Sequence, residues 1–318
     1  MTTLLLIALA GLAAQLVDGG LGMGFGVTST TILIALAGLG PAQASAVVHT
    51  AELGTTLASG ISHWRFGNVD WKVVRRLAVP GAVGAFAGAT VLSNLSTEAA
   101  APLTAMILSL IGVNLVWRFS RGRIRREGGG EHSRGFLGGL GLFGGFIDAS
   151  GGGGWGPVTT STLMTLGRTE PRRIVGTVNT AEFLVTAAAT LGFVIGLWDD
   201  LVANLAAVLA LLIGGVIAAP IAAWLVTRTN PAALGGIVGT LLVALNLPKV
   251  LPLGWGGVAL LVVLGLALSW VGYRRSVTAR AAAGEPVTGS ASEPQGQEVR
   301  VRGLQPGDGA DDVDRGGG

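Results

Sequence analysis

The stretch Asp18-Gly-Gly-Leu-Gly-Met-Gly-Phe-Gly26 decides the fold, because the chain contains a second version of it. That version is Asp148-Ala-Ser-Gly-Gly-Gly-Gly-Trp-Gly156, at an offset of 148 minus 18, or 130 residues. The same offset, without any gap, pairs Thr30 with Thr160, Pro41 with Pro171, and Thr50-Ala51-Glu52 with Thr180-Ala181-Glu182. One register shared over this length indicates that the chain consists of two homologous halves.

The composition places both halves in a membrane. Half of the residues are hydrophobic, only 12% are charged, and the mean hydropathy is +0.64, far from the average of soluble proteins. Most of the longest apolar runs reach the roughly 17 to 25 residues that cross about 30 Å of hydrocarbon; these runs are 77–92, 103–117, 201–226 and 255–271. Glycines recur inside these runs, as close helix packing in lipid requires. The sequence therefore predicts an all-α integral membrane protein.

The repeat and the apolar runs divide the chain into five parts. They are a first membrane repeat (1–117), a basic cytoplasmic linker (118–134), a second membrane repeat (135–247), an extra C-terminal transmembrane helix (248–273) and a disordered cytoplasmic tail (274–318). The tail is rich in Gly, Pro, Ser, Glu and Asp, a composition that cannot bury enough apolar surface to fold. The first apolar stretch lacks a basic flank and a cleavage site, so we expect it to stay in the mature protein.

Basic residues in the short loops predict that the two halves have inverted topology. Lys and Arg favour the cytoplasmic side, and they occur in the loops 65–76, 118–134, 168–173, 228 and 274–280. The intervening loops 38–41, 93–98 and 198–200 carry none, and only Lys249 breaks the alternation. The N-terminus is then outside, the C-terminal tail is cytoplasmic, and the loop 38–41 lies opposite its repeat partner 168–171. Inverted repeats are a recurring design of secondary transporters.

Each half is predicted to begin with a short broken or re-entrant hairpin, followed by three transmembrane helices. The apolar segments of these hairpins are too short to cross a membrane comfortably; they are 4–17 and 27–37 in the first half, and 136–147 and 158–166 in the second. We expect the glycine loop of each hairpin to lie near the midplane, where non-helical backbone is tolerated only beside protein or water.

The glycines of the two loops are candidate anion ligands. Consecutive glycines can turn backbone N–H groups inward as a nest, and the start of the following helix adds its positive dipole end. The candidate substrate-binding residues are Gly22, Gly24, Gly26, Gly152, Gly153, Gly154, Gly156, Trp155, Asn179, Thr50 and Thr180. The alternative is that the glycines only form tight bends and allow close packing. Trp155 is a candidate gate or substrate contact.

Four acids at matched positions are candidates for proton coupling. Asp18 and Asp148 begin the two glycine loops, and Glu52 and Glu182 lie in the next helix of each half. An ionised carboxylate among apolar segments is costly and usually functional. Since burial favours the protonated carboxyl group, these acids suit a proton relay. The alternative is that they cap the broken helices by accepting hydrogen bonds from backbone N–H groups.

A polar stripe follows one face of the predicted helix 42–63. Its members recur at helical spacing: Ser45, His49, Glu52, Thr56, Ser59 and His63. The second half keeps a thinner version, formed by Asn179, Glu182, Thr186 and Thr190. In lipid, such a face lines either a translocation path or a hydrogen-bonded contact between helices. His49 is a candidate proton shuttle, with a satisfied buried histidine as the alternative.

Several classes of function are excluded or disfavoured. The chain has no cysteine, so disulfides and thiolate metal sites are excluded. We find no metal-ligand spacing, P-loop or nucleophile with a matched base, and therefore expect no catalytic residue, no metal, no cofactor and no enzymatic activity. The arginine excess in the loops is attributed to topology and not to nucleic-acid binding. The expected partners are a small anion, protons and the lipid bilayer. Whether the chain forms a homo-oligomer stays an open question.

The second glycine block resembles a known family. The stretch Gly145-Phe-Ile-Asp-Ala-Ser-Gly-Gly-Gly-Gly-Trp-Gly-Pro157, followed by Val178-Asn-Thr-Ala-Glu-Phe183, is similar to the TauE/SafE family of sulfite exporters, and the likeness covers roughly residues 4–247. It implies proton-linked movement of sulfite, sulfonates or related organic anions across the bacterial inner membrane. Leu21 and Met23 interrupt the glycines of the first loop, which leaves the roles of the two hairpins open. The alternatives are a channel-like anion conduit without proton coupling and a membrane assembly factor without transport.

Overall fold

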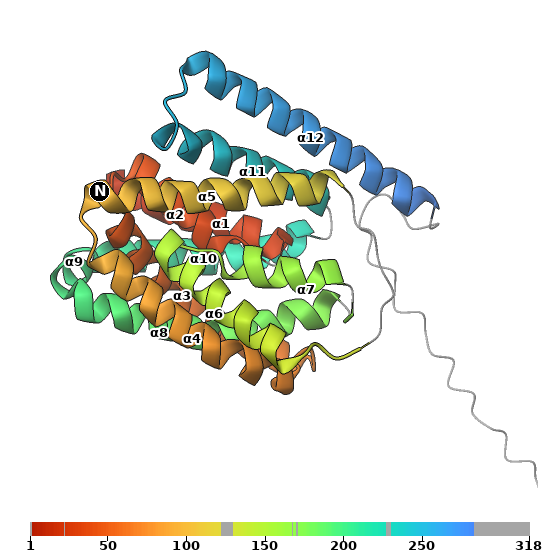
Figure 1. Cartoon of the computed structure of the whole chain (residues 1–318), viewed down its shortest axis with the longest axis horizontal. Helices are drawn as coiled ribbons and strands as arrows, with labels where there is room; N and C mark the ends of the chain where they lie inside the picture. The colour runs from red at the N-terminus through yellow and green to blue at the C-terminus, as the bar shows by residue number, and fades with distance from the viewer. Residues whose placement is uncertain are drawn as a thin grey trace, which may run out of the picture.

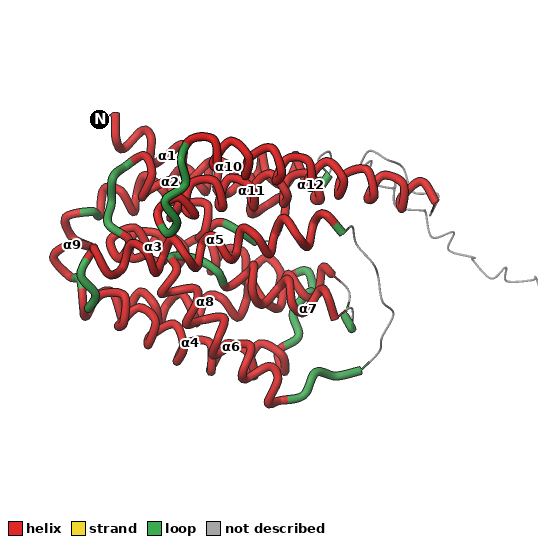
Figure 2. The backbone as a smooth tube through the Cα atoms, turned by 45° about the horizontal axis from the view of Figure 1, so that its top comes forward, coloured by secondary structure: helices red, strands yellow, loops and turns green. Residues whose placement is uncertain are grey.

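The computed structural model describes residues 2–21, 23–121, 130–166, 168–169, 171–226 and 230–282. Within these ranges the chain consists of helices and loops and contains no strand (Figures 1 and 2). Five helices among the described residues are long and apolar enough to cross a membrane, over Trp71–Ser93, Thr97–Ser120, Arg173–Gly196, Ala232–Lys249 and Trp255–Ala279. The predicted all-α membrane class is confirmed.

The first half folds into helices α1 (Thr2–Leu21), α2 (Phe25–Leu36), α3 (Pro41–Arg65), α4 (Trp71–Ser93) and α5 (Thr97–Ser120). The helix starts follow local sequence rules. α3 begins with a proline, whose fixed φ suits the first helical position. Asp70 caps α4, since its Oδ1 accepts hydrogen bonds from the N–H groups of Lys72 at 3.0 Å and Val73 at 3.3 Å.

The second half comprises α6 (Arg134–Gly151), the π-helical turn η1 (Gly156–Thr160), α7 (Ser161–Leu166), α8 (Pro171–Gly196), α9 (Trp198–Ala203), α10 (Leu205–Val226), α11 (Pro231–Asn246) and the 3₁₀ turn η2 (Leu247–Lys249). It repeats the order of the first half, with η1 and α7 together in the place of α2 and with two added short elements, α9 and η2. The short helix α9 occupies a stretch that was predicted as a loop. The extra helix α12 (Trp255–Ala282) continues beyond its predicted end at residue 273. The predicted tail from 283 onward, the linker residues 122–129, Gly22 and Arg228 lie outside the described residues.

The first helix of each hairpin is longer than the sequence predicts. α1 extends to Leu21 and α6 extends to Gly151, whereas the apolar segments of the sequence end earlier, at residues 17 and 147. Asp18 and Asp148 therefore lie in the last turns of these helices. α6 stops where Gly152 adopts a left-handed φ of +74°, a common helix end that favours glycine. The second segments are short, since α2 has 12 residues and η1 with α7 covers 156–166.

The two halves pack by exchanging their hairpins. α1 lies along α10 of the second half, and α6 lies along α4 of the first half. The equivalent helices α3 and α8 contact each other, as do α5 and α11. α1 starts at one end of the bundle, whereas α6 starts at the other end, where α5 finishes (Figure 1). α12 lies outside this core, along α11 and α5 (Figure 1).

Glycines bring α4 and α6 into backbone contact. The residues at this contact are Gly81, Gly84 and Gly88 on α4, and Gly141 and Gly145 on α6. A Cβ atom added at Gly88 would lie 2.6 Å from the carbonyl oxygen of Phe146, and one added at Gly145 would collide with the carbonyl oxygen of Gly81. The related pair α1 and α10 has the same feature, because a Cβ at Gly11 would collide with the carbonyl of Leu211. Small residues thus set the distance between paired helices, as in other membrane bundles.

We predict that Gly145→Ala destabilises the bundle, whereas Gly139→Ala on the same helix does not. An alanine at 145 meets the backbone of α4, which should lower the free energy of unfolding by about 1–3 kcal/mol. An added Cβ at Gly139 meets no atom within 4 Å, so that change should be neutral or slightly stabilising because alanine favours helix. Thermal unfolding of the purified proteins in detergent measures both effects. Equal melting temperatures for the two variants would contradict the packing.

Candidate functional site

The two glycine loops touch each other inside the bundle. A Cβ atom added at Gly26 would lie 2.8 Å from the Cα atom of Gly153, and one at Gly156 would lie 2.7 Å from the Cβ atom of Met23. These two contacts are related by the repeat, since 26 plus 130 is 156 and 23 plus 130 is 153. The hydroxyl group of Thr30 donates a hydrogen bond to the carbonyl of Gly152 across the same contact. The loops therefore form one structural unit built from both halves.

A cavity of about 60 Å³ lies beside this contact. A cavity needs at least about 10–15 Å³ of such space to hold one water molecule, so this one is large enough for water or for one small anion. Its wall contains many of the residues predicted from the sequence, namely Asp18, Glu52, Asp148, Glu182, Gly24, Gly26, Gly154, Trp155, Gly156 and Asn179. The structure thus brings the matched acids of the two halves together at one place.

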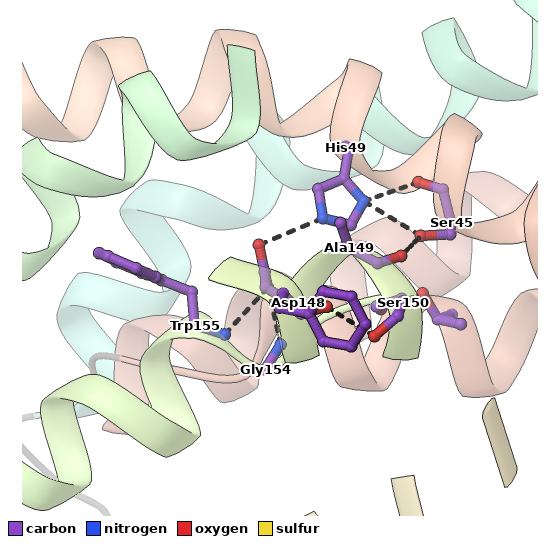
Figure 3. Close-up of polar contacts among 10 residues, drawn as sticks. Ser45, His49, Asp148, Ala149, Ser150, Gly154 and Trp155 are labelled. Atoms are coloured by element: carbon purple, nitrogen blue, oxygen red, sulfur yellow. Dashed lines mark hydrogen bonds and ion pairs between the residues drawn. The ribbon is translucent and has the colours of Figure 1, made fainter. Parts of the chain in front are cut away.

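Asp148 both caps a helical segment and contacts a histidine. Its Oδ1 atom accepts hydrogen bonds from the N–H groups of Gly154 at 2.7 Å and Trp155 at 2.9 Å. Its Oδ2 atom lies 3.2 Å from Nε2 of His49 (Figure 3). Only 3% of Asp148 and none of His49 is exposed. The capping bonds hold the carboxyl group in the orientation that the histidine contact requires.

The hydrogen-bond partners of His49 determine which of its ring nitrogens donates. Nδ1 of His49 lies 2.8 Å from the carbonyl oxygen of Ser45 and must carry a hydrogen, because a carbonyl can only accept. The contact between Nε2 and Oδ2 needs one further proton, which resides either on the imidazole or on the carboxyl group. The hydroxyl group of Ser45 also donates to the carbonyl of Ala149 at 2.9 Å (Figure 3). This network joins α3 of the first half to the end of α6 in the second half.

Asp18 repeats only part of this arrangement. Its carboxyl group is hydrogen-bonded to the backbone N–H of Phe25, the position that corresponds to Trp155 at the offset of 130. The residue that corresponds to His49 is Asn179, since 49 plus 130 is 179. The side-chain amide of Asn179 donates to Oγ of Ser59 at 3.2 Å instead of contacting an aspartate. The two hairpins therefore share their capping but differ in their polar partners.

The cavity wall is acidic. Glu52 is 4% exposed, Glu182 is partly exposed, and both interact electrostatically with Asp18 and Asp148. No Lys or Arg is present among the described residues that line this cavity. No three His, Asp or Glu side chains in the described part of the chain are arranged to hold a metal ion. A negative ligand in this cavity would meet carboxyl groups and neutral donors only.

Several predicted residues lie away from the cavity. The hydroxyl groups of Thr50 and Thr180 donate within their own helices, to the carbonyls of Ala46 and Gly176, both at 2.7 Å. Gly152, Gly153 and His49 are absent from the wall, although all three are buried next to it. Gly22 lies outside the described residues. Trp155 lines the cavity, but its indole N–H already donates to the carbonyl of Val178 at 3.1 Å.

The cavity also contains residues that sequence reasoning did not select, namely Gln15, Phe25, Val27, Thr55 and Pro157. Gln15 could have been found from its spacing, because it precedes Asp18 by three residues and so shares its helix face. Thr55 follows Glu52 by the same spacing. The apolar members Phe25, Val27 and Pro157 carry no such signal.

Known proteins show the same sequence features. Residues 7–248 match the family described as "Sulfite exporter TauE/SafE". The chain is 46% identical over 250 residues to the probable membrane transporter protein YtnM of Bacillus subtilis (strain 168). The aligned region covers 77% of this chain and 82% of that protein. No solved structure is significantly similar. The chain belongs to the sulfite exporter TauE/SafE family, and it is a multi-pass membrane transporter and not an enzyme.

Proposed function

We propose that this transporter moves sulfite, or a related sulfur-containing or organic anion, together with protons across the bacterial inner membrane. The observation that carries the proposal is the cavity beside the joined glycine loops, where acids from both halves line the wall without a Lys or Arg among its described residues. This cavity would be the shared site for the anion and the protons.

The acidic wall is the argument for proton coupling. Two like charges about 4 Å apart repel each other by about 4 kcal/mol at the effective dielectric constant typical of protein sites. An anion therefore cannot stay beside several ionised carboxylates. The carboxyl groups must be protonated when the anion binds, and the anion and the protons then leave together once the site opens on the other side.

The aspartates also compete with the anion for backbone donors. In this structure the N–H groups of Gly154 and Trp155 are bound by Asp148, and that of Phe25 is bound by Asp18. Protonation weakens a carboxyl group as an acceptor, because charged hydrogen bonds are about twice as strong as neutral ones. It would thereby free the glycine-loop donors to bind an oxyanion at the helix starts. The amides of Gln15 and Asn179 add neutral donors on the cavity wall.

We further propose that the halves are inverted in the membrane and that the loops 38–41 and 93–98 lie outside. Two observations support this proposal: α1 and α6 start at opposite ends of the bundle, and each hairpin packs on a helix of the other half (Figure 1). Movement of one half against the other would then open the central cavity alternately to the two sides.

The first test of this proposal is flux through the purified protein in proteoliposomes. We expect uptake of at least one of sulfite, thiosulfate and methanesulfonate, with protons moving in the same direction as the anion. Methanesulfonate is the cleanest probe of coupling, because it carries no titrating proton of its own. A pH-sensitive dye inside the vesicles reports the proton movement. Absence of flux for every one of these anions under any pH gradient would contradict the proposal.

The second test changes the acids of the cavity. Glu52→Gln and Asp148→Asn should each lower proton-coupled flux by at least roughly tenfold, a loss of about 1.4 kcal/mol in transition-state stabilisation, and should flatten its pH dependence. Glu131→Gln is the matched control, because this acid is exposed and lines neither of the two cavities among the described residues. Unchanged flux and unchanged pH dependence in Asp18→Asn and Glu52→Gln would point instead to a channel-like conduit.

A further inference from the structure

A second, larger cavity lies at the end of the bundle whose loops carry no arginine. It has a volume of about 410 Å³ and lies between the loop 38–41, the start of α5, α9 and the end of α11. We call it the vestibule. Both halves of the chain contribute to its wall. Its polar lining residues include the charged Asp200 and Lys249 and the amides Gln43 and Asn246. The vestibule and the central cavity have no lining residue in common among the described residues.

Lys249 is the only basic residue in the wall of the vestibule among the described residues. The chain has just one other lysine, Lys72, which lies at the opposite end of the bundle, at the start of α4. The ammonium group of Lys249 lies 3.5 Å from Oδ1 of Asn246, and within the described ranges no carboxylate forms an ion pair with it. Its charge is therefore not neutralised by a fixed partner.

The surroundings of Lys249 are otherwise acidic. Glu98 lies in the first turn of α5, Asp199 and Asp200 lie in the first turn of α9, and Asp200 lines the vestibule itself. The side-chain amide of Gln43 donates to Oδ1 of Asp200 at 2.6 Å and so holds that carboxylate against the wall. Without Lys249, an anion at this mouth would meet negative charge only. Lys249, which breaks the alternation of basic loops, thus places a positive charge where an anion would otherwise be repelled by acids.

Hydrogen bonds connect the wall of the vestibule, through α2, to the second glycine loop. The amide of Asn246 donates to Oγ1 of Thr31 at 3.3 Å, and the preceding Thr30 bonds the carbonyl of Gly152. Val27 lines the central cavity, whereas Ile34 on the same helix lines the vestibule. Those positions are seven residues apart, which corresponds to about 10 Å along a helix. A short section of α2 therefore runs from one cavity to the other.

We propose that the vestibule is a second anion site, in which Lys249 holds a small sulfur oxyanion between bulk water and the central cavity. The proposal rests on the transport function proposed above. Lys249 supplies the charge, and Asn246 positions its ammonium group from a fully buried amide. The site raises the local concentration of the anion at a mouth that its acids would otherwise make repulsive.

A chemical test of this site does not require transport. The purified full-length protein is acetylated with an N-hydroxysuccinimide ester, and modification of Lys249 and Lys72 is followed by mass spectrometry. Methanesulfonate should slow acetylation of Lys249 several-fold and leave Lys72 unchanged, relative to sodium chloride at equal ionic strength. Equal protection by chloride, or no protection of Lys249, would overturn the oxyanion site whether or not the protein transports.

A kinetic test uses oriented proteoliposomes with the anion presented on the vestibule side. Lys249→Gln should raise the KM for the anion by about fivefold to tenfold, the scale of one lost charge contact at a hydrated site, and should leave kcat unchanged. Lys249→Arg should restore the KM, and Lys72→Gln is the matched control. A KM in Lys249→Gln equal to that of Lys72→Gln would overturn the proposal. Protection of Lys249 without any flux would instead refute the transport function alone.

Discussion

The contact between the two glycine loops is the constraint on which the rest of the structure depends. Gly26 meets Gly153 backbone to backbone, and this closeness joins two hairpins that come from different halves. Non-helical backbone inside a membrane must find hydrogen-bond partners in the protein. Asp148 and Asp18 supply them by accepting N–H groups of the loops. The same carboxyl groups line the cavity, so the residues that satisfy the broken backbone are also the ones that we propose for proton coupling.

Much of the site could be predicted from the sequence, because matched positions of a repeat take matched places in the fold. The offset selected Asp18, Glu52, Asp148 and Glu182, and the structure places all of them around one cavity. The offset does not predict contacts between the two halves. His49 contacts Asp148 across the two halves, and nothing within either half indicates that pair. Helix ends were also predicted too early, since the acids and small residues after the apolar segments continue the helices until a glycine with positive φ ends α6.

The halves are not equivalent, and the differences lie at a few positions. His49 contacts Asp148, whereas the corresponding Asn179 donates a hydrogen bond to Ser59. Met23 fills a place where the second loop has Gly153 with a φ of +125°. Under our proposal, backbone donors of both hairpins bind the anion, and the histidine contact belongs to Asp148 of the second hairpin.

The central claim, that the cavity between the halves is one site open alternately to both sides, is tested most directly by labelling a cysteine there. The natural chain has no cysteine, so Ser59→Cys places a single thiol on the cavity wall. The account predicts that a membrane-impermeant maleimide reaches this thiol from either side of a sealed vesicle, and that methanesulfonate slows the reaction from both. Labelling from one side only, or labelling that the anion does not affect, would contradict it.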